Sequence, residues 1–233
     1  AVYDALPRPA LQQHWAYGAA AGEASGLEAL RGLIFRNTRP VGVIQGLARR
    51  SLIGLRRIQF LRGPALLDGL KPQEREQVFR LIRSQFGLFR GGIVQLMPDL
   101  PDTPATDRFM SGTGYSRVLT GLDTSLLDLR PTPENLRAGL RKSWRYDLKQ
   151  AEKQGFELAR DLTLDRLLAL QADARRLKGY TAGEDAYLGH LPRQMQKVYH
   201  IDVGGETIAA ILILRHGRCA TYQIGWTSDA GRQ

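Results

Sequence analysis

The sequence is poor in cysteine, in acidic residues and in long apolar runs. Its single cysteine, Cys219, excludes an internal disulfide and most metal clusters built on several thiolates. The longest clean apolar run, Ile208 to Leu214, is far too short to span a bilayer. The first ten residues contain neither a basic segment nor a long apolar segment, so no secretory signal is visible. These absences together predict a cytoplasmic protein.

The shortage of acids leaves the chain strongly basic. It carries 33 Lys and Arg against 23 Asp and Glu, a formal net charge of +10, with an isoelectric point of about 10.1. Proteins this basic tend to meet polyanions, either nucleic acid or an anionic membrane surface. The 233 residues are 43% hydrophobic, an ordinary globular composition that suggests one large domain or two small ones.

Residues 132–154 concentrate this charge in a predicted helix. Thr132 is a suitable N-cap for this helix, and Pro133 is suitable for its first position. Gly155 can adopt the left-handed conformation that often follows the end of a helix. Side chains four residues apart are neighbours on a helix surface, and here they form two adjacent ridges. The cationic ridge is Arg137, Arg141, Arg145, Lys149 and Lys153, and the apolar ridge is Leu136, Leu140, Trp144 and Leu148. We expect the apolar ridge to be buried, and the cationic ridge to be either a polyanion-binding surface or a solvated helix face.

Similar patterns precede and follow this helix. An apolar strand, a polar turn and a second strand occupy residues 33–47 and recur at 198–214, and a third strand follows each pair, at 58–61 and 219–226. The other expected elements are helices at 10–20, 72–85, 163–179 and 184–190, strands at 92–97 and within 117–129, a short strand at 156–158, and a loop at 98–107.

This repetition predicts an α/β (α+β) fold of two tandem units with mixed, largely antiparallel sheets. We place the first unit at residues 1–130 and the second at 131–233. Only a polar, turn-like tail follows the third strand of the second unit, so we expect that unit to be incomplete at its C-terminal end.

Three stretches carry a resemblance to a known family: 12–18 (QQHWAYG), 140–155 (LRKSWRYDLKQAEKQG) and 204–228 (GGETIAAILILRHGRCATYQIGWTS). They resemble the Fem-type (FemABX-like) peptidoglycan-bridge aminoacyltransferases, which are built from two GNAT-like units in tandem. The second stretch is similar to the family's W-R-N-x-L-x-x-A-E-K helix, with Tyr146 where Asn is usual. Family members continue beyond the strand that ends this sequence, so the resemblance implies that these residues lack part of the donor cleft and are catalytically incomplete alone.

The resemblance implies N-acyl transfer without a cofactor. The donor would be aminoacyl-tRNA and the acceptor an amine of a peptidoglycan precursor, a nucleotide- or lipid-linked muropeptide, which leaves room for peripheral association with the inner membrane face. Two alternatives stay open. The chain could be an acyl-CoA-dependent N-acyltransferase, or a non-catalytic module that binds nucleic acid or an anionic surface.

Four residues are candidates for substrate binding, and the resemblance assigns no catalytic residue. Tyr222, Gln223 and Trp226 lie on the strand where GNAT-like sites often use backbone N–H groups and a tyrosine to hold the reacting carbonyl. By alternation Tyr222 would share a face with Ile224 and Trp226, and these aromatics are equally consistent with a sheet core. Tyr187 lies where the family places an acceptor-binding tyrosine, or is a packed helix residue. The four histidines show no metal-ligand spacing, so no metal is expected.

Overall fold

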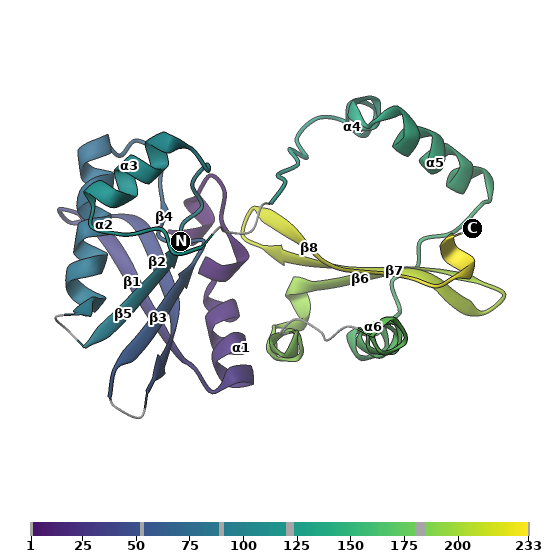
Figure 1. Ribbon diagram of the computed structural model, residues 1–233. Helices are drawn as coiled ribbons and strands as arrows, with labels where there is room; N and C mark the ends of the chain where they lie inside the picture. Colours follow the sequence, from purple (N-terminus) through teal and green to yellow (C-terminus); the bar gives the residue numbers. More distant parts are fainter. Residues whose placement is uncertain (1, 52–53, 89–90, 120–123, 180–184, 233) are drawn as a thin grey trace.

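The computed structural model describes residues 2–232, apart from 52–53, 89–90, 120–123 and 180–184. It is a mixed α+β protein with two separate sheets, as the sequence predicts. Each sheet contains an antiparallel three-stranded meander, which confirms the repeated pattern of strands. Figure 1 shows the first sheet on the left and the second on the right.

The first sheet combines antiparallel and parallel pairs. Its strands are β1 (Glu28–Arg36), β2 (Arg39–Arg50), β3 (Arg56–Leu61), β4 (Ala65–Leu66) and β5 (Gly92–Met97). They run in the order β1-β2-β3-β5, and β4 pairs with β2. β5 is parallel to β3 because the helix α2 (Pro72–Phe86) carries the chain back between them. Ile58 and Phe60 of β3 pack against Val78 and Ile82 of α2 in the core of this unit.

The second sheet is a pure antiparallel meander. It consists of β6 (Gln196–Val203), β7 (Glu206–His216) and β8 (Cys219–Thr227), followed by a short 3-10 helix, η6 (Ala230–Arg232). The helix α6 (Leu164–Lys178) agrees with the prediction of a helix at 163–179. It begins after the Thr163 cap and ends at Gly179, which is in the left-handed conformation. Leu167 of α6 packs on Leu212 and Leu214 of β7, together with residues of the 3-10 helices η4 (Ala186–His190) and η5 (Arg193–Met195).

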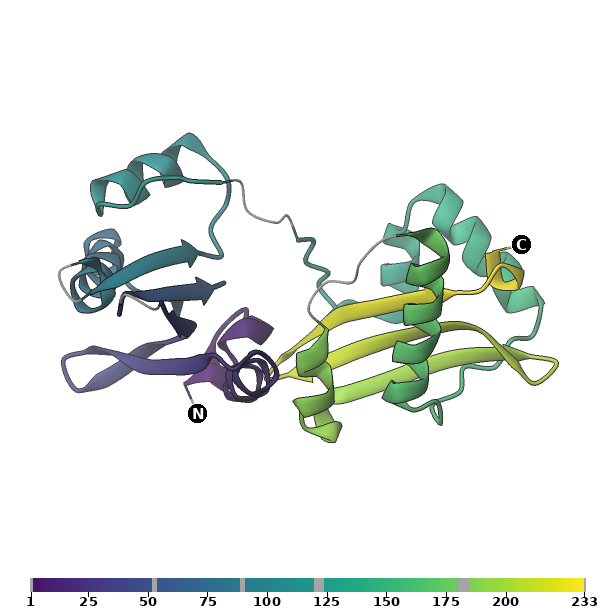
Figure 2. The ribbon, with the colours of Figure 1, turned by 60° about the horizontal axis from the view of Figure 1, so that its bottom comes forward.

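The N-terminal segment lies between the two sheets. It contains the 3-10 helices η1 (Tyr3–Ala5) and η2 (Leu11–Gln13) and the helix α1 (Trp15–Ser25), and both Figure 1 and Figure 2 show α1 beside each sheet. Leu11 and Ala20 pack into the core under the second sheet. Gln13 is buried and bonds to the backbone of β2 and β3. The segment therefore ties the two sheets together, and the division of units at residue 130 stays a prediction.

The predicted helix at 132–154 is wrong in its continuity. Two helices, α4 (Pro133–Gly139) and α5 (Lys142–Lys153), are separated by Leu140 and Arg141, whose ψ angles of 149° and 150° are extended. The Arg145 guanidinium donates to the carbonyls of Ala138 (2.7 Å) and Leu140 (2.6 Å). These bonds satisfy carbonyls at the end of α4 that a continuous helix would have satisfied internally.

The expected burial of the apolar ridge is also wrong. Trp144 is 67% exposed and Leu148 is 39% exposed, while Leu136 and Leu140 are only half-buried. The break between α4 and α5 divides the ridge, so its four side chains do not present one continuous stripe.

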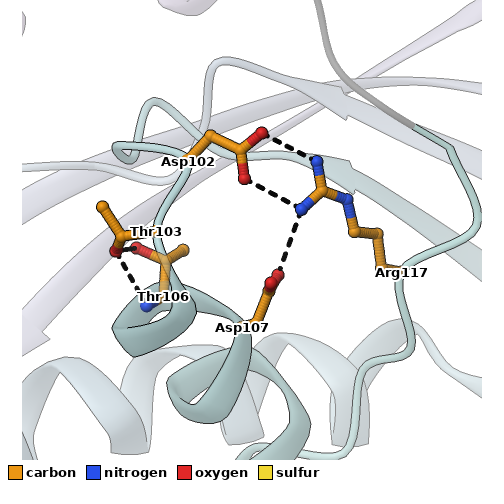
Figure 3. A network of polar contacts seen from close by, with 5 residues as sticks. All are labelled: Asp102, Thr103, Thr106, Asp107 and Arg117. Atoms are coloured by element: carbon orange, nitrogen blue, oxygen red, sulfur yellow. Dashed lines mark hydrogen bonds and ion pairs between the residues drawn. The ribbon is translucent and has the colours of Figure 1, made fainter.

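Two further expectations fail around residue 110. The predicted loop at 98–107 contains the start of a helix, α3 (Pro104–Gly112), whose N–H at Thr106 bonds to the Thr103 cap. No strand forms in the described part of 117–129; residues 120–123 lie outside the described chain. Ion pairs, and not a strand ladder, connect the start of this segment to α3. Figure 3 shows that Arg117 pairs with Asp102 before α3 (2.8 Å) and with Asp107 within it (3.4 Å).

Candidate functional site

The second sheet has one covered face and one open face. α6 and η4 lie on the covered side and α5 on the other side, as the two views agree. The strand register assigns the side chains, because directly paired residues share a face. The open face consists of Lys197, Tyr199 and Ile201 of β6, Ala209, Ile211, Ile213 and Arg215 of β7, and Tyr222 of β8.

A bulge in β8 corrects the predicted placement of its aromatic residues. Tyr222 pairs with Ile213, but Ile224 pairs with Leu212, so Gln223 is an extra residue in the ladder. The extra residue reverses the alternation. Tyr222 therefore lies on the open face, whereas Ile224 is buried and Trp226 packs on the opposite, covered face.

The Tyr222 ring is the exposed aromatic of this strand. It is 64% exposed, and its hydroxyl occupies the space that a side chain on Gly225 would take. Glycine at position 225 thus lets the ring lie along the open face. A side chain this exposed is accessible to a substrate.

Tyr187 lies on the covered side, away from Tyr222. It belongs to η4, is half-buried, and meets the Tyr17 ring edge to face at 5.2 Å. Burial raises the pKa of the Tyr187 hydroxyl above its usual value, so this tyrosine stays neutral. The structure therefore separates the four predicted substrate-binding residues: Tyr222 is on the open face, Gln223 is at the bulge, and Tyr187 and Trp226 pack against the core.

The five cations of the predicted polyanion surface also fall into two groups. Arg137 forms a two-pronged ion pair with Glu152 of α5, and hydrogen bonds from Arg137 lower the pKa of that carboxyl. Arg145 is bound to carbonyls of α4 and the break. These two arginines hold α4 beside α5. Arg141, Lys149 and Lys153 are exposed and have no ion pair within the described residues, so they are the free part of the surface.

Sequence reasoning missed a buried histidine on the covered side of β6, where His200 pairs with Ala210. His200 of β6 is buried, with its Nε2 2.7 Å from Asp161 and its Nδ1 3.0 Å from Asp202. Burial lowers the pKa of His200, but the bonds to two carboxylates outweigh it and the pKa is raised. The spacing of His200 and Asp202 on one strand was a visible signal, whereas Asp161 is 39 residues away.

The second missed feature is a cavity of about 370 Å³ at β6. It is lined by Arg160, Gln196, Lys197, Val198, Tyr199 and Arg215. Three of its six lining residues are cationic. No group of His, Cys, Asp or Glu suited to a metal ion occurs in the described part of the chain. Among the described helices, none has the length and apolar character needed to cross a membrane.

Comparison with known proteins places the fold. No protein-family model matches the sequence, and no curated protein matches it. Eight chains of solved structures match the fold. One is a crystal structure of FemX, which superposes with a TM-score of 0.77 over 99% of this chain and 78% of the FemX chain, at 12% sequence identity. This likeness shows that the protein has a Fem-type fold.

Proposed function

We propose that this protein is a Fem-type aminoacyltransferase that moves an aminoacyl group from aminoacyl-tRNA to an amine of a peptidoglycan precursor peptide. The observation that carries the proposal is the likeness to FemX along 99% of the chain, which takes in both sheets. The motif-like stretch at 140–155, most of which is α5, and the net charge of +10 agree with it.

The reaction would need no cofactor. The acceptor amine attacks the ester carbonyl of the aminoacyl-tRNA, a C–N bond forms, and the ester C–O bond breaks. The terminal ribose hydroxyl of the tRNA then leaves with the proton that the amine loses. Enzymes speed such steps by holding the two reactants together and by donating hydrogen bonds to the developing oxyanion. The exposed side chain of Tyr222 is the candidate of this chain for contact with the reacting centre.

The free cations at and beside α5 would bind the tRNA backbone. Lys149 and Lys153 are exposed on α5 and Arg141 is exposed just before it, and each phosphate contact steepens the salt dependence of binding. Replacing all three with Gln should flatten the slope of log K against log salt by about 2–3, at roughly 0.9 per contact. The matched control removes three exposed cations without ion pairs in the first unit, Arg39, Arg75 and Arg108, and should leave the slope nearly unchanged.

The decisive experiment combines binding with transfer. Charged and uncharged tRNA are titrated against the protein, and labelled amino acid is followed from the tRNA to a muropeptide amine. Transfer of the amino acid by the wild type, and slower transfer by the variant Tyr222→Phe, would support the proposal. Binding of coenzyme A with indifference to tRNA would favour the acyl-CoA alternative. Salt-dependent binding of any RNA, without transfer in a protein carrying all segments that FemX has, would favour the non-catalytic module.

A further inference from the structure

The cavity at β6 forms where a single bridge pairs the sheet edge with the segment after α5. Ala159 and His200 exchange both backbone hydrogen bonds, at 2.9 and 3.0 Å, and this is the one isolated bridge among the described residues. The antiparallel pairing puts Arg160 opposite Tyr199. The Arg160 guanidinium accordingly lies over the Tyr199 ring, 5.1 Å from its centroid, which fixes the position of one cation.

Two more cations reach the cavity from β6 and β7. Lys197 pairs directly with Ile213, and Arg215 is two residues farther along β7 on the same face. Lys197 and Arg215 are therefore diagonal neighbours, a separation that long side chains span. The backbone contributes as well, because the N–H of Val198 points to the same outer edge as that of His200.

These three positive charges are not neutralised by nearby acids. Arg160, Lys197 and Arg215 form no ion pair within the part of the chain that the structure describes. Asp161, next to Arg160, and Asp202 of β6 are both bonded to His200, and Glu157, three residues before Arg160, forms no ion pair with a described residue. Three unpaired cations around one cavity repel one another, and an anion placed among them removes that repulsion.

We infer that this cavity binds a phosphorylated ligand carrying at least two negative charges, such as a pyrophosphate group. Two arginine forks and a lysine match the several oxygens of a phosphate better than the two oxygens of a carboxylate. A volume of about 370 Å³ exceeds what one phosphate fills and leaves room for an attached group. This inference concerns ligand binding alone and holds whether or not the proposed transfer occurs.

Calorimetric titration with inorganic pyrophosphate tests it. We expect the wild-type chain to bind with a dissociation constant below about 1 mM, and the variant R160Q/K197Q/R215Q to bind at least tenfold more weakly. The control R39Q/R75Q/R108Q removes the same charge from the first unit and should bind as the wild type does. Circular dichroism confirms that each variant is folded, and K197Q alone should show a smaller loss in the same direction.

Two competitors then identify where such a phosphate group would come from. A nucleoside diphosphate that displaces pyrophosphate indicates a nucleotide-linked ligand, and the trinucleotide CCA indicates the end of a tRNA. Malonate, a dicarboxylate, should compete at least tenfold less well than pyrophosphate. Equal binding by the wild type and the triple variant, equal losses in the two triple variants, or equal competition by malonate would each overturn the inference.

Discussion

The central strands of the two sheets differ in how many of their faces are covered. In β2 the neighbours Ile44 and Gln45 point to opposite faces and both are buried, the first against α2 and the second against the N-terminal segment. In β7 the buried residues alternate with half-exposed ones, so Leu212 is fully buried and Ile211 is not. The meander of the first unit is therefore packed against other elements on both faces, whereas the meander of the second unit is packed on one face.

This difference indicates which sheet can present side chains to a ligand. A strand buried on both faces has no room for a ligand, and its polar residues serve the structure, as Gln45 does in binding the carbonyls of Gln12 and His14. A strand with one open face can present side chains to a ligand. Tyr222 and the cationic cavity both belong to the open face of the second sheet, so we look for function there.

Adjacent substitutions in β7 should show the largest effect. Leu212→Ala empties a fully buried position and should cost about 2–5 kcal/mol of the free energy of unfolding. Ile211→Ala, its neighbour on the open face, should cost about 1 kcal/mol because the side chain is only half-buried. Urea unfolding followed by circular dichroism measures both. Equal losses would mean that the open face is covered in solution.

The elements that the sequence predicted well carry local signals. α6 has a threonine cap and a terminal glycine, and β6 to β8 have alternating apolar residues separated by glycine turns. No local sequence signal marks the bulge at Gln223. The residues around it are typical of a strand with or without a bulge, yet the one extra residue moves Tyr222 to the other face of the sheet. The apolar alternation predicted the strand correctly and the face incorrectly.

The remaining misses depend on contacts between distant residues. Leu140, Arg141 and Lys142 all favour helices, so nothing local forecasts the break that the bonds of Arg145 to α4 stabilise. The cationic cavity requires contact between Arg160 and Tyr199, which are 39 residues apart in the sequence, and this contact depends on the single bridge between Ala159 and His200. The spacing of residues along a helix or strand does not predict a contact between residues this far apart in the sequence.

The next largest loss of stability is expected on the face of β2 that the N-terminal segment covers. Gln13 donates to the carbonyls of Gln45 (2.9 Å) and Leu61 (2.8 Å) and accepts from the Gln45 N–H (2.8 Å). Gln13→Ala leaves these backbone groups without their partner and should cost about 2–3 kcal/mol. Gln73→Ala, at an exposed position of α2, should change the free energy of unfolding by less than about 0.5 kcal/mol. A small effect for Gln13 would show that water replaces its bonds and that this face of β2 is less tightly covered than the structure indicates.

Two buried histidines of the second sheet should respond to pH in opposite directions. The pKa of His200 is raised above 6.5, so its contribution to stability is complete below pH 6.5 and is lost as the pH rises through the folded value. The free energy difference between wild type and His200→Gln should therefore shrink from pH 6 to pH 9. Asp161→Asn should weaken this pH dependence by removing one carboxylate. A difference that stays constant would show that the pKa of His200 is the same in the folded and unfolded states.

His216 provides the contrast. Its Nδ1 lies 2.9 Å from the Tyr3 hydroxyl and its Nε2 2.8 Å from Thr221, and burial lowers its pKa to about 4. Unfolding lets this histidine take up a proton between pH 6.5 and pH 4, so stability falls as the pH is lowered through that window. The difference between wild type and His216→Gln should shrink toward pH 4 and stay flat above pH 6.5.

The smallest effect is expected on α5, the helix that lies over the open face. Trp144 is 67% exposed, so Trp144→Ala should change the free energy of unfolding by less than about 1 kcal/mol. A buried tryptophan would cost about 3–5 kcal/mol when truncated. Urea unfolding of this variant, beside the equally solvent-facing Tyr146→Ala, measures the difference. A loss above 2 kcal/mol for Trp144 alone would show that α5 packs against the open face in solution, and the second sheet would then be covered on both sides like the first.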